Sequence, residues 1–528
     1  MRYGGFRQGF EGSQDWDLVL RFTEDLPPDK IRHIPAVLYH WRILDGSTAS
    51  DLSAKPYVVN AAKMAITESL QRRGETFFLD GACNSAFHLP RFSVNGTPKI
   101  SIIIPTRNGL SDLRQCLNSL NLNEYPYAEI LVVDNQSDDA DALAYLAEIQ
   151  HRPGYRVLPY PYPFDYAAMH NWAVPRANGE YVCLLNNDTE VITPQWLNEM
   201  LGQAQRQGVG AVGAKLLYAD GAVQHGGVIL GLGGIASHAH KNIPKDSCGH
   251  FGRAALVQNF SAVTGACLTI RKSHWDQVGG MASELTVAFN DVDLCLRLQE
   301  AGLRNVWLPH VLLYHHESKS RGSDVHPEKL QRFALEHAYM QWRWGEWLKR
   351  DPAYNPNLTL EREDFSLAWP PRGQHPWRQE PAIIDVPYGI LHGRTEPLAL
   401  TPGEEFQGSF PIPVGIRGML TGISILIGNY GGASNGTLVL HLQDSDGHSA
   451  YAHSVLDGSQ DNAMLPMPLT QGEISLQGQD RLFFHLRLEG ATHPVAFWVY
   501  TLNDRWGHQI PGHEDRALRI ELQVQESG

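Results

Sequence analysis

Four continuous apolar runs, separated by segments with helical spacing, limit the folds open to this chain more than any other feature. They occupy residues 100–104, 129–133, 155–158 and 181–185. Because their apolar residues are consecutive rather than alternating, we expect these strands to be buried on both faces. Strands of this kind are typical of a mostly parallel sheet that helices cover on both sides. We therefore predict an α/β domain whose ligand crevice lies at the carboxyl ends of the strands.

Polar residues follow three of these runs at the point where each run ends. They are Pro105, Thr106, Arg107 and Asn108 after the first run, Asp134 and Asn135 after the second, and Asn186, Asn187 and Asp188 after the fourth. The carboxyl ends of parallel strands meet at one edge of a sheet. These side chains are therefore expected to surround a single crevice.

The pattern changes near residue 382. Leu438, Leu440 and Leu442 alternate with polar residues, and Gly, Asn and Asp mark turns between several such stretches. Short alternating strands without helices predict an antiparallel β-sandwich over residues 382–528. Prolines crowd residues 351–381, which predicts an extended linker.

A long helix is predicted over residues 327–350. Its apolar and aromatic residues recur every three or four positions and form one stripe, made of Leu330, Phe333, His337, Met340, Trp344 and Trp347. A stripe of this width is expected to pack on the preceding α/β domain. The alternative is a helix that lies on a membrane surface, where Trp and Arg are favoured.

Charge and composition exclude some classes of protein. The 528 residues include 43 basic and 57 acidic side chains, a formal net charge of −14, which argues against a nucleic-acid backbone as the main partner. There is no apolar run of 18 residues and no secretory leader, so we predict a soluble, cytoplasmic protein. The six cysteines are scattered without a C-x-x-C pair, and we expect them to be reduced.

One segment of the chain is repeated. The stretch from Gly4, with Asp15, Asp17 and later His40, matches the stretch from Gly279, with Asp291, Asp293 and His315, at a nearly constant separation. We therefore predict that residues 1–75 are the closing part of a first copy, 76–98 a linker, and 99–350 a complete copy.

Several motifs within residues 99–320 occur in an order that resembles a known family. They are Pro105-Thr106-Arg107-Asn108, Asp134-Asn135-x-Ser137, Asn186-Asn187-Asp188, Thr264-Gly265-Ala266-Cys267, Asn290-Asp291-x-Asp293 and Tyr314-His315-His316. This order resembles the inverting family-2 glycosyltransferases of GT-A type, and most closely the tandem-domain bacterial enzymes that build surface polysaccharides such as O-antigen. The resemblance implies a nucleotide-diphosphate sugar donor and a glycan or lipid-linked glycan acceptor. It also suggests a peripheral contact with the cytoplasmic face of the inner membrane.

Sugar transfer needs a nucleoside pocket and a counter-charge for the diphosphate. We assign nucleotide-sugar binding to the polar residues at the ends of the first, second and fourth runs, with Asp134 accepting hydrogen bonds from the nucleoside. A helix N-cap or an Asx-turn is the structural alternative for Asp134. Asp188 ends a motif of D-x-D type, and His315 follows an apolar strand, so this pair is predicted to bind a divalent metal, Mg²⁺ or Mn²⁺. A purely structural, hydrogen-bonded histidine is the alternative for His315.

The acceptor hydroxyl also needs a base. Asp291 opens a predicted helix, where the helix dipole keeps a carboxylate ionised, and the resemblance makes it the general base. Asp293 has Arg297 four residues later and is predicted to form a structural ion pair. His225, Gly265 and Asn290 are candidates for the acceptor or donor loops. Asp15 and His40 of the first copy are predicted to be catalytically silent.

Two other functions remain open at this point. A glycoside hydrolase can use paired carboxylates such as Asp188 and Asp291, but that function leaves the polar ends of the first two strands without a role. A degenerate transferase that binds sugars or acts as an assembly scaffold is the main alternative.

Overall fold

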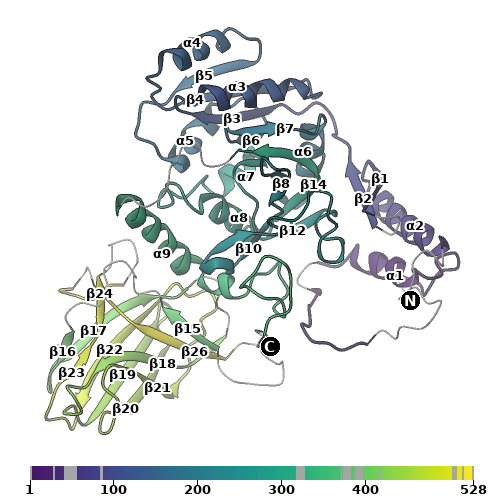
Figure 1. The fold of residues 1–528 in the computed structure, drawn as a ribbon. Coiled ribbons are helices and arrows are strands. Elements are labelled where there is room, and N and C mark those ends of the chain that lie inside the picture. Colours follow the sequence, from purple (N-terminus) through teal and green to yellow (C-terminus); the bar gives the residue numbers. More distant parts are fainter. Residues whose placement is uncertain are drawn as a thin grey trace. The chain divides into compact units, whose positions relative to one another are not determined.

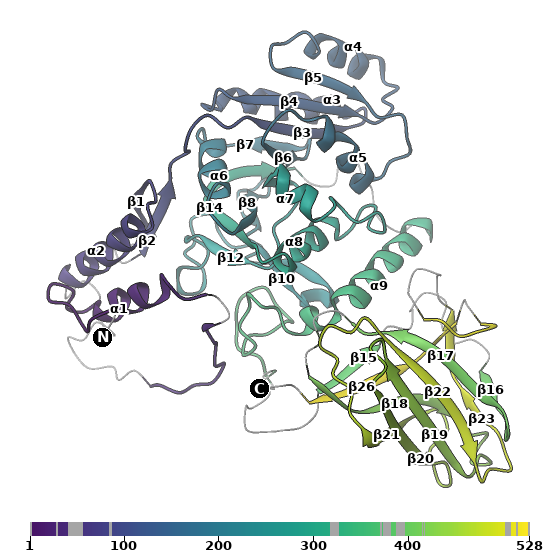
Figure 2. The ribbon, with the colours of Figure 1, turned by 180° about the vertical axis from the view of Figure 1, so that it is seen from behind.

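The computed structural model describes residues 3–27, 30–40, 56–83, 87–316, 327–369, 372, 382–386, 397–413, 416, 418–501, 508–513 and 516–525. The chain divides into two compact units. The first unit comprises Met1–Gly322 with Asp351–Gly373, and the second comprises Ser323–Arg350 with Gln374–Gly528. Figure 1 and the reverse view in Figure 2 show the elements of each unit.

A ten-stranded mixed sheet forms the centre of the first unit. Its strands are β3 (Ile100–Thr106), β4 (Ala128–Asp134), β5 (Tyr155–Pro159), β6 (Tyr181–Leu185), β7 (Thr189–Val191), β8 (Val209–Leu217), β9 (Val223–His225), β12 (Gln258–Phe260), β13 (Cys267–Arg271) and β14 (Arg304–His315). Strands β5, β4, β3 and β6 are adjacent in this order and parallel, as predicted. Beyond β6 the sheet is mixed, because β13 runs antiparallel to both β6 and β8.

Helices lie on both faces of the ten-stranded sheet. They are α3 (Leu110–Ser119), α4 (Ala140–Ile149), α5 (Tyr166–Ala173) and α6 (Trp196–Ala204), followed by α7 (Lys272–Gln277) and α8 (Asn290–Glu300). Ile100, Ile102 and Ile104 pack in one core with α3, α4 and α6, and α5 lies on the other side of the sheet (Figure 1). All four isoleucines of β3 are at most 1% exposed, which explains why apolar residues are consecutive in this strand.

The N-terminal part of the first unit contains two helices and a hairpin. These elements are α1 (Gln14–Thr23), α2 (Pro56–Arg72), β1 (Phe77–Ala82) and β2 (Phe87–Phe92). The hairpin occupies most of the predicted 76–98 linker, so that prediction is wrong. Arg91 of β2 forms an ion pair with the buried Glu199 of α6. The backbone of Phe92 passes so close to Gly202 of the same helix that a Cβ at that glycine would clash with it.

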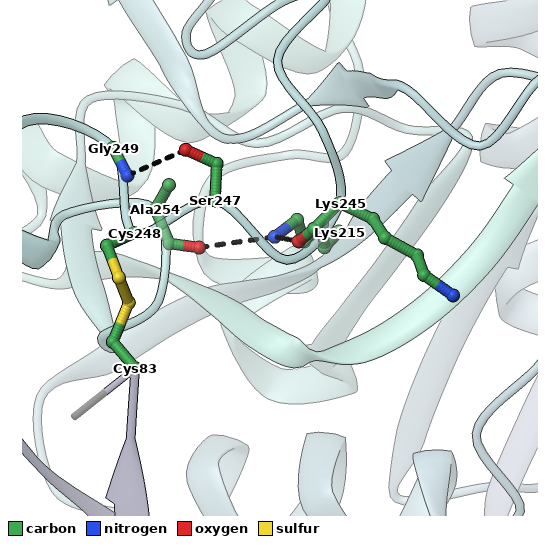
Figure 3. Close-up of a disulfide and its surroundings, with 7 residues drawn as sticks. All are labelled: Cys83, Lys215, Lys245, Ser247, Cys248, Gly249 and Ala254. Carbon is green, nitrogen blue, oxygen red and sulfur yellow. Dashed lines mark hydrogen bonds between the residues drawn. A yellow bond between two sulfur atoms is a disulfide. The ribbon is translucent and has the colours of Figure 1, made fainter. Parts of the chain in front are cut away.

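A disulfide joins Cys83, which directly follows β1, to Cys248, with the two Cα atoms 5.7 Å apart (Figure 3). The same loop is held from the protein interior by the buried Lys215, whose Nζ donates to the carbonyls of Lys245 at 2.6 Å and Ala254 at 3.2 Å. Burial lowers the pKa of Lys215 to about 8. The expectation that all six cysteines are reduced is therefore wrong for this pair, because the fold brings together residues that are 165 positions apart. Buried free thiols are found at Cys116, Cys183, Cys267 and Cys295.

The second unit is built on a ten-stranded antiparallel sheet. Its strands are β15 (Ala382–Val386), β16 (Leu398–Leu400), β17 (Glu405–Pro411), β18 (Met419–Gly428), β19 (Thr437–Asp444), β20 (Ser449–Val455), β21 (Ala463–Gly472), β22 (Arg481–Glu489), β23 (Val495–Phe497) and β26 (Ile520–Gln525), while β24 (Val499–Thr501) pairs with β25 (Arg516–Leu518). Alternate residues such as Leu438, Leu440 and Leu442 are fully buried in one core. The predicted antiparallel β-domain is confirmed.

Two segments between the predicted domains belong to different units than expected. Helix α9 (Pro327–Lys349) groups with the second unit, where it contacts β15 and where its Ala338 packs against Ala517. The stripe was expected to pack on the preceding α/β domain, but the helix groups with the second unit instead. Trp344 of the stripe is fully buried, which does not fit a face that rests on a membrane.

The predicted linker begins as a packed part of the first unit. The carboxylate of Asp351 is buried, and it accepts hydrogen bonds from the Leu230 amide at 2.8 Å and from the Ser261 hydroxyl at 2.5 Å. Burial raises the pKa of Asp351 above its usual value. In the described part of the chain, no helix is both long enough and apolar enough to cross a bilayer.

Candidate functional site

The carboxyl ends of β3, β4 and β6 lie side by side, as the parallel pairing requires. The amide of Asn135 donates to the carbonyl of Thr106 at 2.8 Å. The side-chain nitrogen of Asn187 donates to the Thr106 hydroxyl at 3.1 Å. The structure therefore brings the three polar strand ends into one edge, with Pro105 half-buried and Arg107 exposed beside them.

Two of the predicted nucleotide-binding asparagines hold loops together. Asn108, with a positive φ of 57°, accepts hydrogen bonds from the amides of Asp138 and Asp139 and donates to the Asp138 carboxylate at 2.6 Å. It thereby fastens the loop after β3 to the loop after β4. Asn135 is 2% exposed, and its side-chain nitrogen donates to the carbonyl of Tyr162 at 2.8 Å. Both amide groups are engaged in shaping the crevice.

Asp134 lies half-buried at the end of β4. Its Oδ1 accepts a hydrogen bond from the Ser137 amide at 3.2 Å. This bond to the backbone three residues on is a local structural contact of the capping kind, which was one of the structural alternatives for this residue. A carboxylate oxygen has two lone pairs, so this bond leaves Asp134 able to accept a further hydrogen bond from a ligand.

The predicted metal-binding pair is adjacent in space. Nε2 of His315, at the end of β14, lies 3.3 Å from Oδ1 of Asp188. Nδ1 of the same ring contacts the Gln224 side-chain oxygen at 2.8 Å, and Gln224 also donates to the His315 carbonyl at 3.4 Å. An amide oxygen only accepts, so this contact assigns the proton to Nδ1. Nε2 then faces Asp188 with its lone pair.

A chain of hydrogen bonds links this pair to the predicted base. Asn186 contacts Nε2 of His315 through its side-chain nitrogen at 3.3 Å and accepts from the Tyr166 hydroxyl at 3.3 Å. The Tyr166 hydroxyl also contacts the carbonyl of Gly265 at 3.1 Å. The amide of Gly265 donates to Oδ2 of Asp291 at 2.8 Å. Residues of α5, β14 and α8 thus meet the segment after β6 and the segment before β13 in a single site.

Asp291 and Asp293 differ in their surroundings although both lie in the first turn of α8. Asp293 is fully buried and accepts from Nε of Arg297 at 2.8 Å, so the predicted ion pair is present. Asp291 is half-buried, and its Oδ1 accepts from the Val292 amide at 2.8 Å. Each oxygen of Asp291 therefore has one backbone donor and one remaining lone pair.

Two of the acceptor- or donor-loop candidates lie in the interior. His225 is fully buried, its Nε2 accepts from the Thr264 amide at 3.4 Å, and burial lowers the pKa of its imidazole well below the usual value. Asn290 is 3% exposed and donates to the Val287 carbonyl at 3.0 Å. These contacts give His225 and Asn290 a supporting role, whereas Gly265 takes part directly in the chain of hydrogen bonds.

Sequence reasoning missed two residues of the site. Gln224, which is 1% exposed, orients His315. It precedes His225 in a Gln-His-Gly-Gly segment, in which the sequence analysis named only the histidine as a candidate. Tyr166 bridges Asn186 and Gly265 from the start of α5. No sequence pattern around Tyr166 indicated this role.

Comparison with known proteins relates part of the first unit to a family. Residues 101–245 match the family model described as glycosyl transferase family 2. A protein of Sinorhizobium fredii named uncharacterized protein y4gI is 48% identical over 371 residues, which cover 70% of this chain and 41% of that protein. The O-antigen biosynthesis protein RfbC of Myxococcus xanthus is 39% identical over 366 residues, which cover 69% of this chain and 28% of that protein. The chain therefore spans less than half the length of these two relatives.

A more distant relative matches over a shorter part of the chain. The N-acetylglucosaminyl-diphospho-decaprenol L-rhamnosyltransferase of Mycobacterium tuberculosis is 25% identical over 247 residues, covering 43% of this chain and 79% of that protein. The family match and the mixed sheet confirm the resemblance and the GT-A fold class that it implied. The first unit of this chain contains a family 2 glycosyltransferase domain.

Proposed function

We propose that this protein transfers a sugar, with inversion, from a nucleotide-diphosphate donor to a glycan or lipid-linked glycan acceptor in bacterial surface-polysaccharide biosynthesis. The observation that carries the proposal is the chain of contacts from Asp188 and His315 through Asn186 to Asp291. It joins a pair suited to a metal and a candidate base within one site. The similarity to RfbC, an O-antigen biosynthesis protein, supports a role in polysaccharide biosynthesis.

The residues present suit a divalent metal. Asp188 offers a carboxylate, and His315 offers a lone pair on Nε2 because Gln224 engages Nδ1. Carboxylate and imidazole together suit Mn²⁺, and a carboxylate with diphosphate oxygens and water suits Mg²⁺. When bound, such an ion neutralises charge on the leaving diphosphate. With Asp188 as the principal carboxylate, we expect the ion to bind weakly alone and more tightly together with the nucleotide.

Asp291 is the proposed base. It lies in the first turn of α8, and its two backbone donors fix the carboxylate in position. Its remaining lone pairs can accept the proton of the acceptor hydroxyl, whose oxygen then attacks the anomeric carbon as the nucleoside diphosphate leaves. Direct displacement of this kind inverts the anomeric configuration.

The polar ends of β3 and β4 are the proposed nucleoside side of the site. Asp134 and Thr106 end neighbouring strands in register. Arg107 is the exposed cation of this edge, and Asn108 and Asn135 hold the loops in place. We propose that the protein acts in the cytoplasm or at the cytoplasmic face of the inner membrane, where nucleotide sugars are available.

A donor panel tests the proposal. The purified full chain is incubated with UDP-, GDP- and dTDP-sugars, including dTDP-rhamnose, in the presence of Mg²⁺, Mn²⁺ or EDTA, and the released nucleoside diphosphate is measured. We expect release from one donor class with either metal and little release in EDTA. NMR of the product reports the anomeric configuration. If no donor is turned over with either metal, the transferase proposal fails and the sugar-binding scaffold becomes the better account.

A further inference from the structure

The second unit has a groove on the outer face of its sheet. The groove has a volume of about 730 Å³ and is lined by Gln407, Gly408, Ser409, His441, Gln443, Phe483, Phe484, His485, His508, Gln509, Ile510 and Pro511. A volume of this size is within the range of small-ligand sites. The groove lies within one unit, and its residues take no part in the site around Asp188 and Asp291.

Strand register arranges the side chains of this part of the sheet in two rows across four strands, of which β17, β22 and β19 line the groove. Gln407, His485, His441 and Tyr451 are successive cross-strand neighbours on β17, β22, β19 and β20. Ser409, Phe483, Gln443 and Ser449 form the next row on the same strands. Three strand spacings make each row about 14 Å long, enough for more than one sugar ring.

The rows combine flat rings with exposed amides. Phe483 is 43% exposed and Tyr451 is 42% exposed, although both lie on strands of a folded sheet. The Tyr451 ring stacks on His441 with centroids 4.6 Å apart. Gln407, Gln443 and Gln509 are exposed beside these rings. An aromatic face packs against the apolar face of a sugar ring, and an amide both donates to and accepts from neighbouring hydroxyls.

Charge and edge geometry argue against several other ligands. Among the described residues that line the groove, none is Lys, Arg, Asp or Glu. Charged partners of lining residues are Arg481, which donates to the Ser409 hydroxyl at 2.8 Å, and Glu405, which lies 3.1 Å from Nε2 of His485, so the margin carries both signs of charge and favours neither an anion nor a cation. The amide and carbonyl of Ser409 on β17 both bond to Gln509, at 2.8 and 2.9 Å. A peptide therefore cannot add as a further strand at this point of the edge.

We infer that this groove, formed by β17, β19, β22 and residues 508–511, is a binding site for a neutral glycan chain. The choice of a glycan among neutral polar ligands rests on the proposed function, because the polysaccharide under construction is the polymer that such an enzyme meets. Phe483 provides the stacking surface, and Gln407 and Gln443 contact ring hydroxyls. The site holds the polymer on the second unit separately from the transfer reaction.

Affinity electrophoresis of the full chain in gels containing a neutral rhamnan, a mannan or a glucan tests the inference, with heparin as the charged probe. We expect at least one neutral polymer to retard the protein. Phe483→Ala and Gln443→Ala should each weaken that binding about tenfold. The matched controls Ile383→Ala and Gln525→Ala, which change exposed residues on β15 and β26 of the same unit, should bind as the unaltered protein does.

Three results would overturn the inference: no retardation by any neutral polymer, equal binding by the groove and control variants, or binding to heparin alone. The outcome is separable from that of the proposed function. Asp291→Asn should keep glycan binding while losing nucleoside diphosphate release, and Phe483→Ala should show the reverse with a short soluble acceptor. Glycan binding without any donor turnover supports the groove and contradicts the transferase proposal.

Discussion

Helices α1 and α8 carry the same sequence pattern in two surroundings. In α1, Asp17 is 1% exposed and forms an ion pair with Arg21 four residues later, with Arg7 as a second partner. In α8, Asp293 is fully buried and forms the equivalent pair with Arg297. The second aspartate of the pattern thus has the same structural role in both helices.

The first aspartate of the pattern distinguishes the two helices. Asp291 accepts the Gly265 amide and lies in the chain of contacts that reaches His315. Asp15 is exposed on α1, and His40, the counterpart of His315, is exposed as well. The buried ion pair needs only the helix itself, whereas a base needs strand ends from elsewhere in the chain. We therefore propose that Asp15 and His40 are catalytically silent in this chain, while Asp17 keeps the structural role that the pattern has in both helices.

The largest expected effect comes from the shared ion pair. Asp293→Ala leaves the guanidinium of Arg297, which is 16% exposed, without its partner and should lower the free energy of unfolding by about 3–5 kcal/mol. Asp17→Ala should also destabilise the chain, because Arg21, which is 11% exposed, loses this partner, whereas Arg7 keeps its ion pair with Glu68. Urea denaturation followed by circular dichroism measures both. Equal stability of Asp293→Ala and the unaltered protein contradicts the structural role of the pair.

A smaller but more specific effect is expected at the first aspartates. Asp291→Asn should reduce turnover by at least about a hundredfold, the range typical of a missing general base, with little change in melting temperature or nucleotide binding. Asp291 is not the N-cap of α8, which is Phe289, and the oxygen of an Asn can keep one of its two backbone bonds, so a purely structural Asp291 predicts that turnover is largely retained. Asp15→Asn is the matched control and should leave turnover unchanged. If Asp15→Asn removes activity as completely, the interpretation of Asp15 as catalytically silent is wrong.

The smallest effect separates the two histidines of the pattern. Gln224→Ala should weaken binding of Mn²⁺ in the presence of nucleoside diphosphate by about tenfold to a hundredfold, because a ligand histidine then loses the contact that orients it. His40→Ala is the control and should not change metal affinity. Calorimetry of the complex reports the dissociation constant directly. Tight metal binding to the protein without nucleotide would contradict the predicted sharing of ligands with the diphosphate.

Local sequence patterns determined much of the architecture. Consecutive apolar residues in β3, β4 and β6 indicated strands covered on both faces, and alternating leucines in β19 and β22 indicated an antiparallel sheet with one buried face. The Asp293–Arg297 pair followed from spacing alone. These features were readable because side-chain periodicity and neighbours four residues apart on a helix are properties of the element itself.

Contacts between distant segments were decided only by the tertiary structure. The Cys83–Cys248 disulfide joins residues 165 positions apart, Gln224 reaches His315, and Tyr166 bridges Asn186 to Gly265. The sequence predicts a linker where the structure has the hairpin of β1 and β2. The hairpin is held by the ion pair of Arg91 with Glu199 on α6, which no local pattern indicates. The grouping of α9 with the second unit was equally hidden, since an amphipathic stripe shows that a helix face is covered without showing by what. Such contacts depend on how the chain returns on itself, and no local spacing records that path.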